Sequence, residues 1–230
     1  MIFKKQWKRL PILLSVFCIM STGNLIAGSA KEPPPSWTGN ITPFIGFVVL
    51  NQNDWGETAT NGEAGVMVDI KKREWPLGIV GEFLYSEGHR FFYTTTDDYR
   101  SKPGYGDIGI PIGSHGEMTL IAFEATIGGR KTWEGHPVFR PFIGGGVSYR
   151  DIEGKLFYTG NSFLNTDSGK TVNRGRGAGQ WIDAGTYFRF DNRLNIGLEY
   201  RFSYAEIKMS SGDYVLTGGH HVRFMVGYHW

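Results

Sequence analysis

Cysteine and long apolar runs are what this 230-residue sequence has least of. Its one cysteine, Cys18, excludes a disulfide framework within the chain. After the N-terminal region, no run approaches the length of about 20 apolar residues that a membrane-spanning helix needs. A polytopic helical membrane protein is therefore excluded.

Glycine and aromatic residues are abundant instead, with 33 Gly, 16 Phe, 11 Tyr and 7 Trp. Glycine weakens a helix interior by about 1 kcal/mol relative to alanine, whereas aromatic side chains fit the pleated surface of a strand. The composition indicates an all-β chain. The length suits one barrel or sandwich, and nothing in the composition requires a second domain.

Residues 1–30 are typical of a cleaved secretory signal peptide. A basic start is followed by the apolar stretch Leu10–Met20 and by small residues, with cleavage expected after Ala30 or, alternatively, after Ala27. A membrane anchor is the other interpretation, but the apolar stretch is short for a span. Removal leaves 20 basic against 22 acidic residues, so no nucleic-acid binding is expected. The residues lost include Lys4, Lys5, Lys8, Arg9 and Cys18.

After a lead-in at residues 31–40, which we expect to be periplasmic, apolar side chains recur at every second position of eight segments. The last segment is the clearest, with Val222, Phe224, Val226, Tyr228 and Trp230 on one face. The orientation of the first segment is open, because it is apolar on both faces. The segments are Ile41–Leu50, Ala64–Lys71, Leu77–Ser86, Thr119–Arg130, Phe139–Arg150, Ile182–Phe190, Leu194–Ala205 and His221–Trp230.

Short and long connections alternate between these segments. The short ones are Lys72–Pro76, Lys131–His136 and Asp191–Arg193, and the long ones are Asn51–Glu63, Glu87–Gly116, Asp151–Gly179 and Lys208–Gly219. Outer-membrane barrels have short periplasmic turns and long extracellular loops. The pattern therefore predicts an eight-stranded antiparallel up-and-down transmembrane β-barrel over residues 41–230, with both termini periplasmic.

The charges indicate which face meets lipid. An inward apolar face would place rows of large aromatic side chains in a narrow lumen, so we expect the apolar rows to face outward and the charges to face inward. The balance of charge predicts a lumen plugged by ion pairs. The inward set has five acids and five arginines: Asp69, Glu82, Glu124, Asp183, Glu199, Arg140, Arg150, Arg189, Arg201 and Arg223. Aromatic girdles are expected from Tyr85, Tyr149, Tyr204, Phe190, Tyr228, Trp230, Trp75 and Trp133.

Three sequence features resemble a known family. The alternation that ends on Trp230 resembles the β-signal read by the outer-membrane assembly machinery. Arg140–Val147 (RPFIGGGV) is similar to a central strand of the small OmpA-like and opacity-type outer-membrane barrels. Trp37–Ile41 and Gly227–Trp230 resemble a subgroup of these barrels without an assigned activity. The resemblance implies insertion by that machinery, with periplasmic chaperones as partners, and carries over no catalytic residue.

Some small outer-membrane barrels act on lipid A, and their deacylase family carries a His-x-Ser-Asn motif that is absent here. The nearest substitute is one of two adjacent histidines with serines and an acid at the outer end of the last two strands. Only one of the two histidines can face inward, because neighbours on a strand point to opposite faces. The candidates are His220, His221, Ser203, Glu206, Ser210 and Ser211.

Other polar groups match no site motif. His89, His115, His220 and His221 lack metal-ligand spacing. Gly175-Arg176-Gly177 lacks the context of a nucleotide-binding loop and is read as a flexible loop, and Asp97, Asp98 and Asp107 are read as solvated charges. We therefore predict no catalytic, cofactor or metal site.

The sequence as a whole predicts a monomeric integral protein of a Gram-negative outer membrane, in contact with its lipids and lipopolysaccharide. A surface ligand is expected at loops 87–116 and 151–179. The alternatives are a lipid A-modifying enzyme and a narrow, low-conductance channel.

Overall fold

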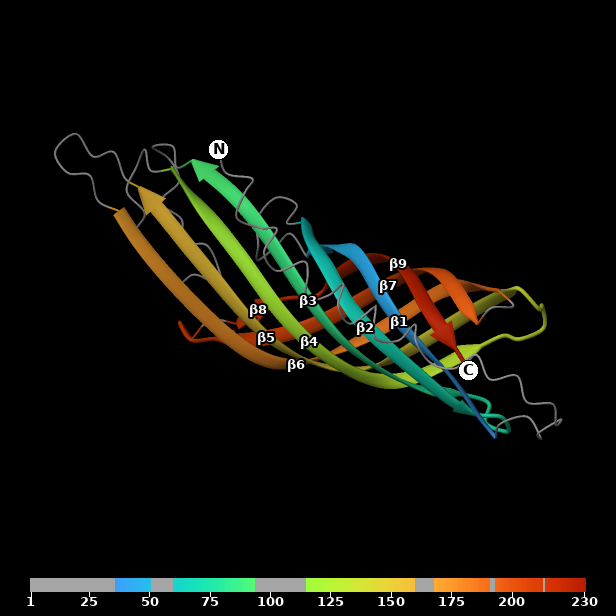
Figure 1. The fold of residues 1–230 in the computed structure, drawn as a ribbon. Coiled ribbons are helices and arrows are strands. Elements are labelled where there is room, and N and C mark those ends of the chain that lie inside the picture. The colour runs from blue at the N-terminus through green and yellow to red at the C-terminus, as the bar shows by residue number, and fades with distance from the viewer. Residues whose placement is uncertain (1–35, 51–59, 94–114, 160–167, 191–192, 213) are drawn as a thin grey trace. The chain divides into compact units, whose positions relative to one another are not determined.

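The computed structural model describes residues 36–50, 60–93, 115–159, 168–190, 193–212 and 214–230, which form one antiparallel sheet (Figure 1). Pairing of β6 with β7 and of β1 with β9 closes this sheet into a barrel. Within these ranges the strands are β1 (Trp37–Leu50), β2 (Thr60–Lys72), β3 (Gly78–Tyr93), β4 (His115–Thr132), β5 (Phe139–Thr159), β6 (Ser168–Arg189), β7 (Leu194–Met209), β8 (Tyr214–Leu216) and β9 (Gly219–His229). The predicted signal peptide, residues 1–30, lies outside the described residues.

Thr217 and Gly218 interrupt the last strand of the wall. β8 and β9 nevertheless keep a single register against β7. The Thr217 amide donates a hydrogen bond of 2.9 Å to the Ala205 carbonyl across the break. β8 and β9 therefore act as one strand, and the wall has eight strands, as the alternation predicts.

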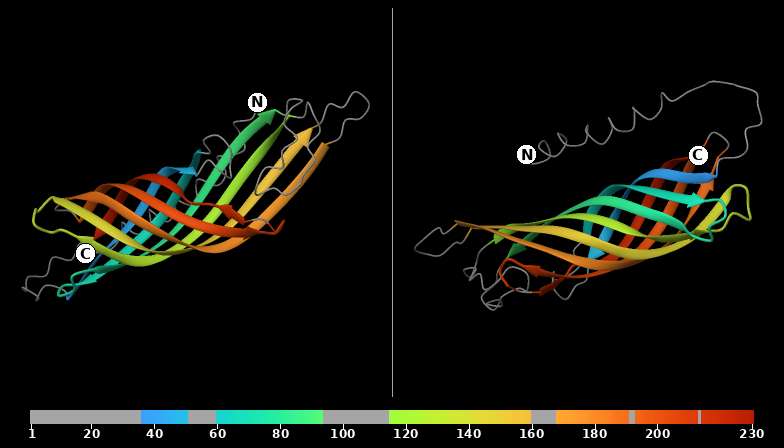
Figure 2. Two further views of the ribbon diagram at one scale, coloured as in Figure 1. Left: turned by 180° about the vertical axis from the view of Figure 1, so that it is seen from behind. Right: turned by 90° about the horizontal axis from the view of Figure 1, so that it is seen from below.

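Strands β3, β4, β5 and β6 continue beyond the ends of the other strands on the long-loop side (Figure 2). β4 and β5 remain paired as far as His115 and Thr159, whereas β1 ends at Leu50. The loop boundaries expected at 87–116 and 151–179 are therefore wrong. Residues 87–93, 115–116, 151–159 and 168–179 belong to strands, which we call the outer extension.

The outer extension escaped detection because its outward row is charged. Along β5 the outward positions change from Val147 and Tyr149 to Asp151, Glu153 and Lys155. The inward row of the same strand continues with apolar residues such as Ile152 and Leu156, which are buried. Up to Tyr149 the outward residues of β5 are apolar, and beyond it the inward residues are apolar, while the backbone remains a strand.

The two faces of the wall carry the residues that the sequence assigns to them. Outward apolar side chains are exposed around the barrel. The inward charges are buried, except that Asp69, Arg140 and Arg189 are half-buried. β1, whose orientation was open, points Ile45 and Phe47 outward and buries Phe44 and Val48. The exposed outward set includes Ile79, Phe83, Phe123, Ile127, Ile143, Val147, Ile182, Leu198, Tyr200, Val222 and Phe224.

The barrel interior is not polar along its whole length. Its long-loop end holds a buried apolar cluster, which we call the outer plug. These side chains come from strands on opposite sides of the wall. The predicted polar filling of ion pairs therefore does not extend to this end. The outer plug consists of Val48, Leu50, Leu120, Ile152, Leu156, Ala205, Ile207, Met209 and Val215.

Inward glycines provide space for large side chains at one level of the barrel. Gly128 on β4 lies opposite Gly146 on β5. A Cβ atom at Gly128 would lie 2.7 Å from the Trp181 ring, closer than van der Waals contact allows. The ring fills the space that the absent Cβ atom leaves.

We expect Gly128→Ala to lower the free energy of unfolding by about 1–3 kcal/mol, because the new methyl group overpacks against Trp181 and the backbone of β5. Urea unfolding of the refolded protein measures the effect. Gly81→Ala is the control, since its Cβ would lie 3.8 Å from the nearest atom, the Thr126 carbonyl oxygen. Equal destabilisation by both substitutions would contradict the packing argument.

Candidate functional site

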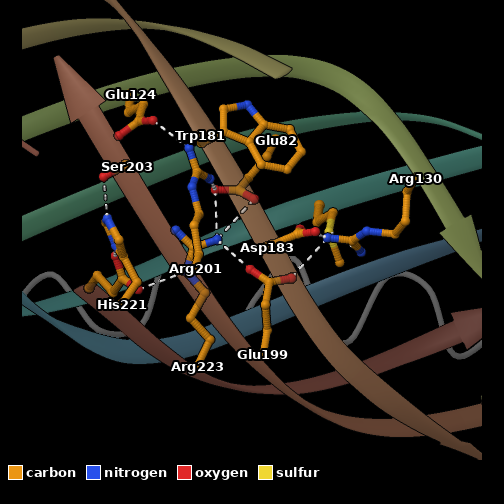
Figure 3. Close-up of polar contacts among 12 residues, drawn as sticks. Glu82, Glu124, Arg130, Trp181, Asp183, Glu199, Arg201, Ser203, His221 and Arg223 are labelled. Atoms are coloured by element: carbon orange, nitrogen blue, oxygen red, sulfur yellow. Dashed lines mark hydrogen bonds and ion pairs between the residues drawn. The ribbon is translucent and has the colours of Figure 1, made fainter. Parts of the chain in front are cut away.

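A chain of buried ion pairs crosses the barrel interior below the outer plug (Figure 3). The contributing strands supply it with side chains that alternate inward along them. Arg201 from β7 and Arg223 from β9 lie at the centre, and each is 1% exposed or less. The acids come from β2, β3, β4, β6 and β7: Glu63, Glu82, Glu124, Asp183 and Glu199.

The two central arginines each bridge carboxylates from different strands. Arg201 donates to Glu82 Oε1 and to Glu124 Oε1, both at 2.6 Å. Arg223 donates through Nε to Glu63 at 2.7 Å and through Nη1 to Glu82 at 3.0 Å and Glu199 at 2.9 Å. Glu82 is thus shared by both guanidinium groups. The charges pair across the lumen, which offsets much of their cost of desolvation.

Arg130 continues the chain towards the short-turn end. Its Nη2 donates to Asp183 and, at 2.9 Å, to Glu199. Its Nη1 donates to the Tyr187 hydroxyl at 3.0 Å. Glu199 therefore connects Arg130 to Arg223, and the network is continuous.

Aromatic rings pack beneath the arginines. The Arg130 guanidinium lies 4.1 Å from the centre of the Phe142 ring, and that of Arg223 lies 4.4 Å from the centre of the Phe44 ring. The guanidinium of Arg201 lies 4.8 Å from the Trp181 ring centre. Cation–π contacts of this kind gain strength away from water. Rings and ion pairs together fill this level of the interior.

One end of the network has the geometry of a catalytic triad. Ser203 Oγ lies 2.7 Å from His221 Nε2, and His221 Nδ1 lies 2.8 Å from Glu63 Oε2. Arg150 Nη2 donates to Ser203 Oγ at 2.7 Å, so the hydroxyl proton is directed to His221. Neutral His221 then donates its Nδ1 proton to Glu63.

This arrangement lacks room for a substrate. Ser203 is 0% exposed, and His221 and Glu63 are also buried. The adjoining cavity has a volume of about 20 Å³, enough for one water molecule. The hydrogen bond from Arg150 also withdraws electron density from the Ser203 oxygen and lowers its nucleophilicity. The hydrogen bonds among Ser203, His221 and Glu63 hold these side chains in the packed interior, and the Ser203 hydroxyl is not accessible as a nucleophile.

The other candidates at the outer end lie elsewhere. His220 points outward, where its Nδ1 lies 2.6 Å from the Tyr200 hydroxyl. Glu206 is exposed on the outward row of β7, so Glu63 takes the place expected for it beside His221. Ser210 and Ser211 hydrogen-bond Asn173 on β6. The structure thus joins Ser203 and His221 and separates them from the other candidates.

Of the remaining polar candidates, His89 on the outer extension pairs with Glu87 and with Glu117 of β4. Gly175 and Gly177 lie inside β6 and are therefore not in a flexible loop, which corrects that expectation. Asp97, Asp98 and Asp107 lie outside the described residues, as does the side chain of His115.

In the described ranges no three His, Cys, Asp or Glu side chains are placed to hold a metal ion. Across the same ranges, no helix has the length and apolar character to span a membrane.

Two members of the network were missed from the sequence. Glu63 was assigned to a loop, although β2 begins at Thr60, and the alternation starting at Ala64 extends back to it. Arg130 lies on the inward row of β4, but it stands at the strand end beside Lys131 and was not counted among the lumen charges. Extending the alternation of β2 back by one step finds Glu63, and Arg130 already lies on the polar row of the predicted segment Thr119–Arg130.

We expect fluorophosphonate probes not to label the folded barrel, because Ser203 Oγ is inaccessible and bonded to Arg150. Labelling is measured by gel fluorescence beside Ser203→Ala, which reports the background. Labelling of the folded wild-type chain that Ser203→Ala abolishes would show that the nucleophile is accessible.

No known protein family profile and no curated protein matches this chain. Solved structures are similar to it at low identity. Ail, the attachment invasion locus protein of Yersinia pestis, in complex with the heparin analogue sucrose octasulfate, is 13% identical with a TM-score of 0.43, covering 85% of this chain and 100% of its own.

Two further structures show likeness of the same order. Neisserial surface protein A is 8% identical with a TM-score of 0.42, covering 86% of this chain and 98% of its own. A major outer membrane protein from Thermus thermophilus is 12% identical with a TM-score of 0.42, covering 85% of this chain and 100% of its own. The function proposed below rests on this chain's own surface and interior.

Proposed function

We propose that this protein is an integral outer-membrane β-barrel that does not conduct and that presents the outer extension as an interaction surface. The observation that carries the proposal is a closed belt of exposed apolar side chains around the wall. Phe83, Ile127 and Ile182 are each at least 60% exposed. A soluble protein rarely exposes a continuous apolar surface of this extent.

The height of the belt supports a lipid environment. On β5 the outward apolar row runs from Phe139 to Tyr149, and on β7 it runs from Leu194 to Tyr204. With about 3.3 Å per residue and a tilt of about 40°, either row spans about 25 Å, the height of the apolar band of outer-membrane barrels. Charged residues begin two positions later, at Asp151 and Glu206.

The residues at the two ends of the barrel support one orientation of the barrel in the membrane. Aromatic side chains at the short turns include Trp75 and Trp133, and Trp37 packs edge-on against Trp75 with ring centres 5.3 Å apart. At the other end, Arg176 pairs with Asp151 at 2.8 Å on the outer extension. Short turns and both ends of the barrel domain then face the periplasm, and the charged extension faces outward.

The interior supports a closed barrel. The ion-pair network and the outer plug occupy successive levels of the lumen, and both are built from buried side chains. Transport through the described interior would require the Arg201 and Arg223 pairs to separate. We therefore propose roles outside the lumen, in contact with lipopolysaccharide and with a surface ligand at the outer extension. Delivery by periplasmic chaperones and the assembly machinery, and a monomeric state, remain predictions.

Planar bilayer recordings test the closed state, and a general porin serves as the positive control. We expect no discrete conductance steps from the reconstituted protein. Folding is checked on the same sample by the shift in gel migration on heating that membrane barrels show. Steady conductance steps from folded protein would favour the narrow-channel alternative, and a chain soluble without detergent would contradict the membrane assignment.

A further inference from the structure

The short-turn mouth of the barrel holds two arginines that differ from those deeper inside. Arg130, Arg150, Arg201 and Arg223 each have a carboxylate oxygen within 3 Å. Arg140 from β5 and Arg189 from β6 point into the same interior and have no carboxylate within 4 Å among the described residues. Their positive charge is therefore not neutralised by direct pairing.

The wall brings these two side chains together. Arg140 lies opposite Tyr187 in the β5–β6 ladder, so Arg189 is its diagonal neighbour on the same inward face. Such neighbours lie about 7–8 Å apart at Cα, within reach of two long side chains. Like charges at this spacing repel one another unless an anion lies between them.

A polar pocket lies at this position. It is lined by both arginines and by Asn40, Thr132, Glu134, Tyr187 and Asn195. Its volume of about 20 Å³ takes one oxygen atom of a larger anion, whose remaining atoms would lie outside it between the two half-buried arginines. The two acids near the pocket have other partners. Glu134 is 3.3 Å from Lys71, and Asp69 accepts hydrogen bonds from Asn40 at 2.9 and 3.1 Å.

The pocket has unused hydrogen-bonding groups of both kinds. Arg140 Nε is buried without a partner in the described structure, as is Asn195 Oδ1. The Tyr187 hydroxyl accepts a bond from Arg130, which leaves its proton free to donate. Two guanidinium groups, two hydroxyl groups and one amide oxygen suit a tetrahedral dianion that has one proton to donate.

We propose that Arg140 and Arg189 bind a phosphate group at the short-turn mouth. Hydrogen phosphate carries two negative charges, which balance both arginines, and its P–OH can donate to Asn195 Oδ1. A phosphate monoester either balances both charges as a dianion or keeps one P–OH as a monoanion. The site is independent of the closed-barrel proposal. It uses the proposed orientation only to place the phosphate source in the periplasm, either in solution or in a lipid headgroup.

The experiment follows the Arg140 side chain directly. The ¹⁵N–¹H signal of Arg140 Nε is recorded in a phosphate-free detergent while inorganic phosphate is added at constant ionic strength. We expect a saturable downfield shift, and we expect Arg189→Gln to weaken the apparent affinity about tenfold, the effect of losing one charge-assisted interaction. Arg140→Gln assigns the signal by removing it.

Arg193→Gln is the matched control, because Arg193 lies at the same mouth but points outward and donates to the Tyr228 hydroxyl at 2.8 Å. It should leave the titration unchanged, and heat-dependent gel migration confirms that each variant is folded. The spectrum in nanodiscs that contain phosphatidic acid, whose headgroup is a phosphate monoester, is recorded without added phosphate. A shift there assigns the site to a headgroup.

Three results would overturn the proposal. These are no shift in either medium, an unchanged affinity in folded Arg189→Gln, and an equal response to acetate. The last result would show attraction of any anion without recognition of phosphate.

Discussion

Arg223→Met is expected to lower the free energy of unfolding by about 3–5 kcal/mol, the cost of breaking a buried ion pair from one side. Arg223 is 1% exposed and bonds Glu63, Glu82 and Glu199. Methionine fills a similar volume but leaves these three carboxylates close together with one fewer cation. Their mutual repulsion and incomplete solvation act against the folded barrel.

The measurement is the urea midpoint of the refolded protein in vesicles, read from the fraction of the fast-migrating folded band. Arg176→Met is the matched control, because Arg176 makes one ion pair with Asp151 on the exposed extension, and exposed pairs contribute about 1 kcal/mol or less. If both variants unfold at the same urea concentration, the interior network does not stabilise the barrel.

Leu198→Arg should also have a large effect, of about 2–4 kcal/mol in phospholipid vesicles. Leu198 lies midway along the outward row of β7 and is 55% exposed. If that row faces the bilayer centre, the new guanidinium must enter hydrocarbon or pull water and headgroups towards it. If the row faced water, the same substitution would cost almost nothing.

Phe157→Arg is the comparison, since Phe157 is exposed on the outer extension. The expected cost there is below about 1 kcal/mol, and it comes from the neighbouring Lys170, which packs over the Phe157 ring. Urea unfolding in vesicles measures both variants. An equal loss of unfolding free energy at positions 198 and 157 would refute the placement of the apolar belt in the lipid bilayer.

The barrel could be predicted from the sequence because every strand has one exposed apolar face and one inward face, so its residues alternate in the same way. Residues such as Leu198 and Glu199 alternate between the outer surface and the interior, and this alternation predicts the number of strands, their orientation and the inward acids. The resemblance to opacity-type barrels remains a prediction. Connection lengths were less informative, because Asp151 and Glu153 resemble loop residues although they face water from a strand.

Side-chain partners could not be predicted in the same way. Alternation places Arg140 and Arg201 on the same face but cannot show that Arg201 meets two carboxylates while Arg140 meets none in the described part of the chain. The partners of Arg201 are decided by the register of the strands in the closed wall, that is, by which residues of β6 and β9 lie opposite those of β7. The pairing of β1 with β2 and with β9 brings Glu63 to His221, whereas alternation alone turns Glu206 outward.

The pairing of distant parts of the chain also has a kinetic consequence. Arg223 and Glu63 are separated by 160 residues, and Arg201 and Glu82 by 119. Contacts of such long range slow folding, because a large loop must close before they form. The acids of β2 and β3 thus lack Arg223 until β9 arrives. Barrel closure and charge neutralisation become one late, cooperative event. A chain stalled before its last strand therefore keeps unpaired carboxylates on the inward face of β2 and β3.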